Sequence, residues 1–239
     1  MSGKCLLEIS VETLEAALAA ERGTADRIEL CGSLSTGGVT PDAKLLRAVR
    51  AQVRIPIFSM VRPRAGDFLY SKDEFEEMKR AISAAKDSGM DGVVLGILTE
   101  KRRVDSERTR QLVEIAKPLQ VTYHRAFDEA ADLQQALEDV MQSGAKRILT
   151  SGGAKSALEG AAVLARLVEA AGDRIFVVPG AGISASSIEQ VARQTGAREF
   201  HSGLSAVLPY GSKDYRKFED EVRKLAKQIA RISGTPTDP

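Results

Sequence analysis

Four short motifs of the chain are rich in arginine, glycine and other residues that can bind a ligand or catalyse a reaction. They are Arg62-Pro63-Arg64-Ala65-Gly66-Asp67-Phe68, His124-Arg125-Ala126-Phe127-Asp128, Thr150-Ser151-Gly152-Gly153 and Gly180-Ala181-Gly182. Guanidinium groups hold carboxylate or phosphate with paired hydrogen bonds, and backbone amides beside glycine can approach an anion closely. The motifs therefore predict a site for an anionic small molecule, although each glycine pair could also form an ordinary turn. The expected ligand-binding residues are Arg62, Arg64, Asp67, Arg125, Ser151, Gly152, Gly180, Gly182, His201 and Ser202.

Proton transfer is the chemistry that His124 could add to such a site. An imidazole titrates near neutral pH, and Asp128 or another carboxylate could fix its tautomer. Glu8 or Glu29 could act as a second proton carrier. The candidate catalytic residues are therefore Glu8, Glu29, His124 and Asp128. A structural role for His124 is the alternative, and no particular reaction is indicated.

Eight short apolar runs alternate with longer segments of helical period, and they would place these residues at strand ends. The runs are Leu6 to Ser10, Arg27 to Cys31, Ile55 to Val61, Gly92 to Leu95, Gln120 to His124, Arg147 to Ser151, Ile175 to Val178, and Glu199 to Ser202. Such βα repetition predicts an α/β fold, namely a single (β/α)8 TIM barrel. A doubly wound sheet is less favoured, because no glycine-rich fingerprint follows the first strand. In a barrel, the functional rim lies where the strands end.

Helix signals complete the domain. Thr40-Pro41 offers an N-cap followed by proline, Ser71 to Glu74 forms a capping box, and Tyr215 to Ile232 carries an apolar stripe at helical spacing. These features predict one TIM-barrel domain over residues 1–232. Residues 233–239 are expected to form a disordered tail.

Side-chain alternation along the strands predicts charged residues inside the barrel. If Leu7, Ile9, Ile28 and Leu30 face the helices, their charged neighbours face inward. We therefore expect Arg27 to pair with Glu199 as a structural contact. Two further inward carboxylates, Glu8 and Glu29, would lie close together near the strand ends and need a proton or a cation. Arg62 is the nearest candidate partner, with a metal ion or a cationic substrate group as alternatives.

Composition excludes several classes of function. The 34 basic and 33 acidic side chains nearly cancel, so the sequence predicts no nucleic-acid partner. No apolar run reaches the roughly 20 residues that span a bilayer, which predicts no membrane partner. Two cysteines and the absence of a signal peptide predict a cytoplasmic location. Neither a P-loop nor a dinucleotide-binding fingerprint is present.

The four motifs, together with Glu29-Leu30-Cys31 and Gly37-Gly38-Val39-Thr40-Pro41, resemble those of the CutC family of copper homeostasis proteins. The resemblance extends from about Leu6 to Ser202, in the same order and with similar spacing. Ala65 departs from the family pattern, which usually has a second glycine there. The resemblance implies a TIM barrel, a cytoplasmic homo-oligomer and a link to copper homeostasis, with copper as the expected ion.

Few residues of the chain suit copper. Cuprous ion prefers thiolate and thioether ligands, usually at least two of them. Cys5 begins the first strand and Cys31 ends the second, so they cannot hold one ion together. We expect any cuprous site to depend on Cys31, with Met60 or a partner subunit adding a ligand, although a buried structural cysteine is the alternative. His124 and His201 with Glu8 or Glu29 could instead bind Zn²⁺ or Cu²⁺. An enzyme acting on an anionic small molecule by acid/base chemistry is the alternative function.

Overall fold

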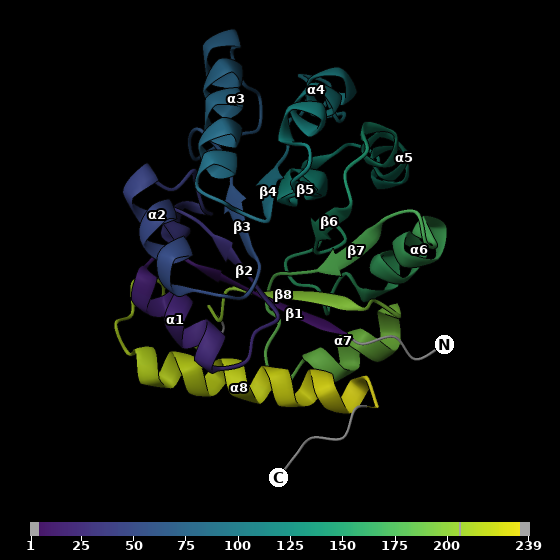
Figure 1. Cartoon of the computed structure of the whole chain (residues 1–239). Coiled ribbons are helices and arrows are strands. Elements are labelled where there is room, and N and C mark those ends of the chain that lie inside the picture. The colour runs from purple at the N-terminus through teal and green to yellow at the C-terminus, as the bar shows by residue number, and fades with distance from the viewer. Residues whose placement is uncertain (1–4, 206, 235–239) are drawn as a thin grey trace.

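The computed structural model describes residues 5–205 and 207–234, in which eight strands are surrounded by eight α-helices (Figure 1). The strands are β1 (Leu6–Val11), β2 (Arg27–Leu30), β3 (Ile57–Met60), β4 (Gly92–Leu95), β5 (Gln120–Tyr123), β6 (Arg147–Thr150), β7 (Phe176–Pro179) and β8 (Glu199–Ser202). The helices are α1 (Leu14–Arg22), α2 (Ala43–Gln52), α3 (Lys72–Asp87), α4 (Ser106–Ala116), α5 (Leu133–Ser143), α6 (Ala161–Ala171), α7 (Ile188–Thr195) and α8 (Tyr215–Ile232). Two short 3-10 helices, η1 (Leu34–Thr36) and η2 (Arg125–Glu129), follow β2 and β5.

The strands form one parallel sheet that curls into a nearly closed barrel. Backbone ladders join them in the order β7-β6-β5-β4-β3-β2-β1-β8, and the two end strands, β7 and β8, are in contact. The last helix, α8, packs against both α1 and α7 and so covers the strands nearest this seam (Figure 1). The predicted (β/α)8 TIM barrel is confirmed.

The core lies between the barrel and its helices. Leu7, Ile9, Ile28 and Leu30 are fully buried there, as the strand alternation predicted. The charged residues between them in sequence, Glu8 and Glu29, face the barrel interior and contact other polar side chains there, as described below. The apolar stripe of α8 is also confirmed, with Val222, Leu225 and Ile229 buried.

The helix signals are confirmed at α3 and wrong at α2. At α3, Ser71 and Glu74 form the predicted capping box. At α2 the N-cap is Asp42, whose carboxylate accepts from the amide of Leu45 at 2.7 Å. The Thr40 hydroxyl is engaged elsewhere, because it accepts from the amide of Arg62 at 2.9 Å. Thr40 thus ties the loop after β2 to the end of β3.

The ends of the chain are described only in part. Ser233 follows α8, and its hydroxyl accepts from the amide of Cys5 at 2.9 Å. The rest of the predicted tail, residues 235–239, lies outside the described residues. Within the described part of the chain, every helix is too short or too polar to cross a membrane.

Candidate functional site

Four charged residues form a connected layer inside the barrel, here called the lower ion-pair layer: Glu8, Arg27, Arg147 and Glu199. Arg27 donates to Glu8 at 2.5 Å and to Glu199 at 2.7 Å, and Arg147 also donates to Glu199 at 2.7 Å. Both guanidinium groups lie over the ring of Phe58. The predicted pairing of Arg27 with Glu199 is confirmed. Arg147 was not predicted, although it begins the sixth strand as Arg27 begins the second.

An acidic cluster of Glu8, Glu29 and His201 lies next to this layer. One ligand atom from each residue falls within 4.8 Å of the others. In the ladders, Glu8 lies beside Arg27 on β2 and His201 on β8, whereas Glu29 lies beside Ser10. Glu29 is therefore two residues nearer the strand ends than Glu8. Of these three residues, Glu29 and His201 border the cavity described below, and Glu8 does not.

The protonation of the acidic cluster follows from burial and from its neighbours. Burial opposes the charge of Glu8, but Arg27 and His201 outweigh it and keep the pKa of Glu8 below its usual range. Burial raises the pKa of Glu29. Burial would lower the pKa of His201, but the charge of Glu29 and the hydrogen bond to Glu8, 2.7 Å from Nδ1, raise it. Glu29 and His201 thus compete for a proton.

Cys31 lies beside the acidic cluster. Its Sγ donates to Oε1 of Glu29 at 3.3 Å, and the other carboxylate oxygen of Glu29 is buried without a partner among the described residues. Cys31 packs with Met60, Phe58 and Val94 in a small cluster inside the barrel. Burial and the nearby charge of Glu29 raise the pKa of the Cys31 thiol well above its usual value. Cys31 therefore packs with Met60, and it is a protonated thiol at neutral pH.

Arg62 does not take the role predicted for it. Its guanidinium donates to the backbone carbonyls of Thr36, Gly37, Gly38 and Gly66, at distances between 2.7 and 3.4 Å. In place of Arg62, the partners of Glu8 are Arg27 and His201, and the predicted pairing is wrong. The loop after β2 brings the first three carbonyls to the end of β3, and Gly66 belongs to the loop after β3 itself; no sequence pattern indicated these contacts. Arg62 is 6% exposed and lies over the ring of Phe68.

His124 caps the 3-10 helix η2 as a neutral side chain. Its Nδ1 accepts from the amide of Ala126 at 3.2 Å, so in the neutral ring the proton is on Nε2. That Nε2 is buried and has no partner among the described residues. Burial and the charge of Arg62 lower the pKa of His124 to about 3. His124 is therefore suited to donate a hydrogen bond as a neutral side chain, and not to gain and lose a proton near neutral pH.

Asp128 binds the loop after β6 instead of His124. Its carboxylate accepts from the amides of Ser151 and Gly153 and from the hydroxyl of Thr150, and Arg125 donates to it at 2.8 Å. The prediction that Asp128 fixes the tautomer of His124 is therefore wrong, since the amide of Ala126 does so. Two of the backbone donors expected to hold an external anion after β6 are already used by this internal carboxylate.

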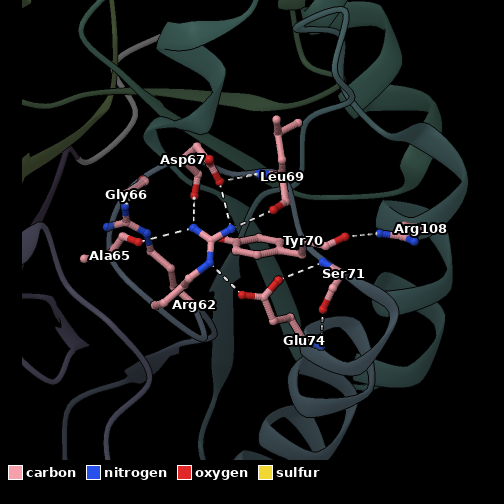
Figure 2. Close-up of polar contacts among 10 residues, drawn as sticks. Arg62, Ala65, Gly66, Asp67, Leu69, Tyr70, Ser71, Glu74 and Arg108 are labelled. Carbon is pink, nitrogen blue, oxygen red and sulfur yellow. Dashed lines mark hydrogen bonds and ion pairs between the residues drawn. The ribbon is translucent and has the colours of Figure 1, made fainter.

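Arg64 and Asp67 bind each other outside the barrel. Arg64 donates to Asp67 at 2.9 Å, to Glu74 at 2.6 Å and to the carbonyl of Leu69 at 2.7 Å. Figure 2 shows Asp67, Leu69 and Glu74 converging on one guanidinium beside the ring of Tyr70. These contacts hold the loop between β3 and α3 to the start of α3. Arg64 therefore has its own anionic partners.

A cavity of about 350 Å³ opens at the carboxyl ends of the strands. The predicted residues that border it are Glu29, Arg62, His124, Arg125, Asp128, Gly182 and His201. The predicted residues outside its lining, within the described chain, are Glu8, Cys31, Arg64, Asp67, Ser151, Gly152, Gly180 and Ser202. Residues that the sequence did not indicate also border it, among them Leu34, Leu149, Gly203 and Tyr210.

Three of the predicted ligand-binding residues, Gly180, Gly182 and Ser202, lie at the ends of β7 and β8 and differ in what they contact. Gly180 packs so closely that a Cβ would come within 2.5 Å of Leu149 Cδ1. The Ser202 hydroxyl donates to the carbonyl of Ile183 at 2.7 Å, which joins the loops after β7 and β8. Gly182, with a φ of 72°, borders the cavity. Close packing and loop bracing thus account for Gly180 and Ser202.

Comparisons with known proteins agree with the motifs. The model of the CutC family matches residues 5–206. A copper homeostasis protein cutC homolog of Homo sapiens is 48% identical over 208 residues, covering 87% of this chain and 76% of the relative. A family protein CutC of Chromobacterium violaceum is 48% identical over 82% of this chain and 80% of the relative.

Solved structures show the same similarity. The crystal structure of a putative copper homeostasis protein CutC from Streptococcus agalactiae has a TM-score of 0.79 and 29% identity, covering 83% of this chain and 98% of that chain. A phosphoribosyl anthranilate isomerase from Thermotoga maritima has a TM-score of 0.63, 13% identity and coverage of 95% and 99%. The second likeness concerns the barrel fold alone.

Proposed function

Because this chain belongs to the CutC family, we propose that it takes part in copper homeostasis by binding a copper ion at the mouth of its barrel. Glu29 and His201 would be the principal ligands, and Cys31 would join them for cuprous ion. The observation that carries this proposal is the buried oxygen of Glu29, which has no partner among the described residues, beside the imidazole of His201.

Charge balance supports a cation at this position. Arg27 and Arg147 balance Glu8 and Glu199 in the lower ion-pair layer. Glu29 is then the additional carboxylate of the barrel interior, and burying a lone charge is strongly unfavourable. A proton on Glu29 or His201 can supply the balance, and so can a metal ion that replaces the proton.

Glu8 fits the role of a residue that orients a metal ligand. Histidines that bind metals commonly donate their second ring N–H to a carboxylate, which fixes the tautomer and turns the other nitrogen toward the ion. Nδ1 of His201 lies 2.7 Å from Glu8, so Nε2 is the nitrogen available for a ligand. Glu8 is itself held by Arg27. We therefore assign Glu8 to positioning His201 rather than to binding copper directly.

The donor set suits the two oxidation states of copper differently. Carboxylate and imidazole suit Cu²⁺, whereas thiolate and thioether suit Cu⁺. Cys31 packs with Met60 next to Glu29, so it can offer sulfur to Cu⁺ once its proton is released. Cys5 belongs to the core between barrel and helices and lies apart from this cluster.

Competition with chelators of known affinity tests the proposal for each oxidation state. Cys31→Ser should abolish tight Cu⁺ binding, and Cys5→Ser, which replaces the other buried free thiol, is the matched control. His201→Gln should abolish Cu²⁺ binding, and Glu8→Gln should weaken it about ten- to hundredfold. Binding should also release protons in a weakly buffered solution. Equal Cu⁺ affinity in the parent and in both cysteine variants would remove Cys31 as a ligand, and unchanged Cu²⁺ affinity in His201→Gln would refute the site.

We also propose that the protein is a homo-oligomer in the cytoplasm. The two cysteines are free thiols, which is typical of a reducing compartment. Self-association is supported by the family resemblance alone. Light scattering on the purified protein measures its mass in solution, and fractionation of the producing cells measures its location.

A further inference from the structure

We propose that the cavity also binds a small hydroxycarboxylate, whose carboxylate lies against Arg62 and His124. These two residues, with Arg125, are here called the basic wall. They come from the ends of β3 and β5, and all three border the cavity. This inference does not depend on copper, because the carboxylate would be held by side chains that are not proposed copper ligands; the one shared residue is Glu29, which would contact the ligand's hydroxyl in metal-free protein.

Arg62 is a buried cation to which the described residues supply no counter-ion. The groups that accept its hydrogen bonds are backbone carbonyls, of Thr36, Gly37, Gly38 and Gly66, and within the described residues no carboxylate forms an ion pair with it. At 6% exposure, water screens this charge poorly. Buried charges are normally paired, and a guanidinium is well suited to a carboxylate. The neighbouring Arg64, by contrast, pairs with both Asp67 and Glu74.

His124 supplies a second donor, to which the described residues offer no acceptor. With Nδ1 accepting from the amide of Ala126, the neutral imidazole carries a proton on Nε2, and this atom is buried without a partner in the described chain. An unpaired buried donor is unfavourable and is usually satisfied by a bound group. The ring borders the cavity and packs against Phe68, 4.9 Å between ring centroids. An oxyanion placed here would satisfy both His124 and Arg62.

The other residues around the cavity favour a carboxylate over a phosphate. Asp128, Glu129 and Glu29 border the same space, so a dianion would meet repulsion that a monoanion meets less. The amides of Ser151 and Gly153 already bind Asp128. One unpaired guanidinium balances a single negative charge.

A hydroxyl group on the ligand would satisfy the remaining buried acceptor of the cavity wall. Oxygen Oε2 of Glu29 has no donor among the described residues, and Glu29 borders the cavity together with the basic wall. In metal-free protein this oxygen can accept from a hydroxyl. A cavity of about 350 Å³ has room for a molecule with both groups. The ligand class is therefore a small hydroxycarboxylate rather than a simple fatty acid.

The chain contains two histidines, and this allows a direct test. In metal-free protein with isotope-labelled histidine, NMR reports separately on His124 in the basic wall and on His201 in the acidic cluster. Glycerate should shift the His124 resonances in a saturable manner, propionate should bind more weakly because it lacks hydroxyl groups, and inorganic phosphate should not compete. Absence of any shift with glycerate would overturn the proposal. Phosphate binding as tight as that of glycerate would overturn the ligand class, and equal binding of propionate would overturn the contact with Glu29.

Variants assign the binding to the basic wall. Arg62→Gln should weaken glycerate binding about ten- to hundredfold, the range for a lost charge-assisted hydrogen bond. Arg64→Gln, two positions along the same loop, is the matched control and should bind as the parent does. Since Arg62 also braces a loop, calorimetry on His124→Phe and His124→Gln is the second test. His124→Phe should lose glycerate binding, whereas His124→Gln, which keeps an N–H donor, should retain part of it. The site would be contradicted if Arg62→Gln bound glycerate as tightly as the parent does. It would also be contradicted if the two His124 variants bound glycerate equally.

Discussion

The lower ion-pair layer and the side chains that border the cavity, here called the cavity wall, lie next to each other in one barrel. They differ in whether their charged and polar groups find partners within the chain. In the layer, Arg27 and Arg147 share the carboxylate of Glu199, and Glu8 accepts from Arg27. In the cavity wall, Glu29 and His124 each keep a buried polar atom without a partner among the described residues. A polar network that is complete within the chain holds the barrel together, whereas unpaired atoms beside a cavity point to a ligand.

The difference means that similar residue types have opposite consequences for stability. A carboxylate in the lower layer is needed by its cationic partners. Within the described residues no guanidinium donates a hydrogen bond to Glu29, so a negative charge on this buried carboxylate destabilises the ligand-free protein. Binding sites commonly retain groups of this kind because they interact with the ligand rather than with the fold.

The largest expected effect comes from breaking the lower layer. Glu199→Gln should lower the free energy of unfolding by about 3 to 5 kcal/mol, because two buried guanidinium groups lose their shared anion. Urea denaturation of metal-free protein measures this change. Glu29→Gln is the matched carboxylate variant in the cavity wall and should lose less than about 1 kcal/mol. Equal losses in the two variants would remove the distinction between the regions.

The next effect is an acid sensitivity that originates at His124. Its pKa is about 3 in the folded protein and 6.5 in the unfolded chain, so below pH 6.5 only the unfolded chain takes up this proton. The stabilisation is present above pH 6.5 and is lost as the pH falls toward 3, by up to about 1.4 kcal/mol per pH unit. Denaturation at several pH values should show a shallower decline in His124→Gln than in the parent. Parallel curves would show that His124 charges in the folded state.

Glu29 should give a pH dependence of the opposite sign. Burial raises the pKa of Glu29, so the folded protein holds this proton at pH values where the unfolded chain has lost it. Its contribution to stability is present below the unfolded pKa and is lost as the pH rises through the folded value. Metal-free Glu29→Gln should therefore gain stability relative to the parent as the pH rises from about 4 to 8. A gain that is the same at every pH would place the folded pKa of Glu29 at its ordinary value.

The barrel and its charged interior could be predicted because strand alternation has a fixed period. Once Leu7 and Ile28 face the helices, Glu8, Arg27 and Glu29 must face inward, and the structure places them there. Of the predicted partners of these inward charges, Arg27 with Glu199 was correct and Arg62 with Glu8 was wrong. The offset between strands decides such pairs, and it sets Glu8 beside Arg27 and His201 rather than beside Glu29.

Partners supplied by loops could not be predicted. Asp128 follows His124 closely in sequence, but the 3-10 turn carries its carboxylate to the amides of Ser151 and Gly153. Arg62 is held by carbonyls of a loop that comes from the previous strand. Both outcomes depend on backbone positions that no side-chain pattern encodes. Residue types therefore indicated a polar barrel mouth, and loop geometry decided which of its groups are free for a ligand.

The smallest expected effect distinguishes an exposed arginine from a buried one in the same motif. The side chain of Arg64 is 39% exposed, and its ion pairs with Asp67 and Glu74 are on the surface. Surface ion pairs contribute about 0 to 1 kcal/mol each and are screened by salt, so Arg64→Ala should lower the free energy of unfolding by about 1 kcal/mol, and by less in high salt. Arg62→Ala should lower it more and independently of salt, because its carbonyl partners are buried with it. Thermal unfolding at low and high salt compares the two variants. Arg64→Ala could instead lose as much free energy of unfolding as Arg62→Ala at both salt concentrations. That result would mean that the whole motif stabilises the loop, and the charge of Arg62 would then be explained by structure rather than by a ligand.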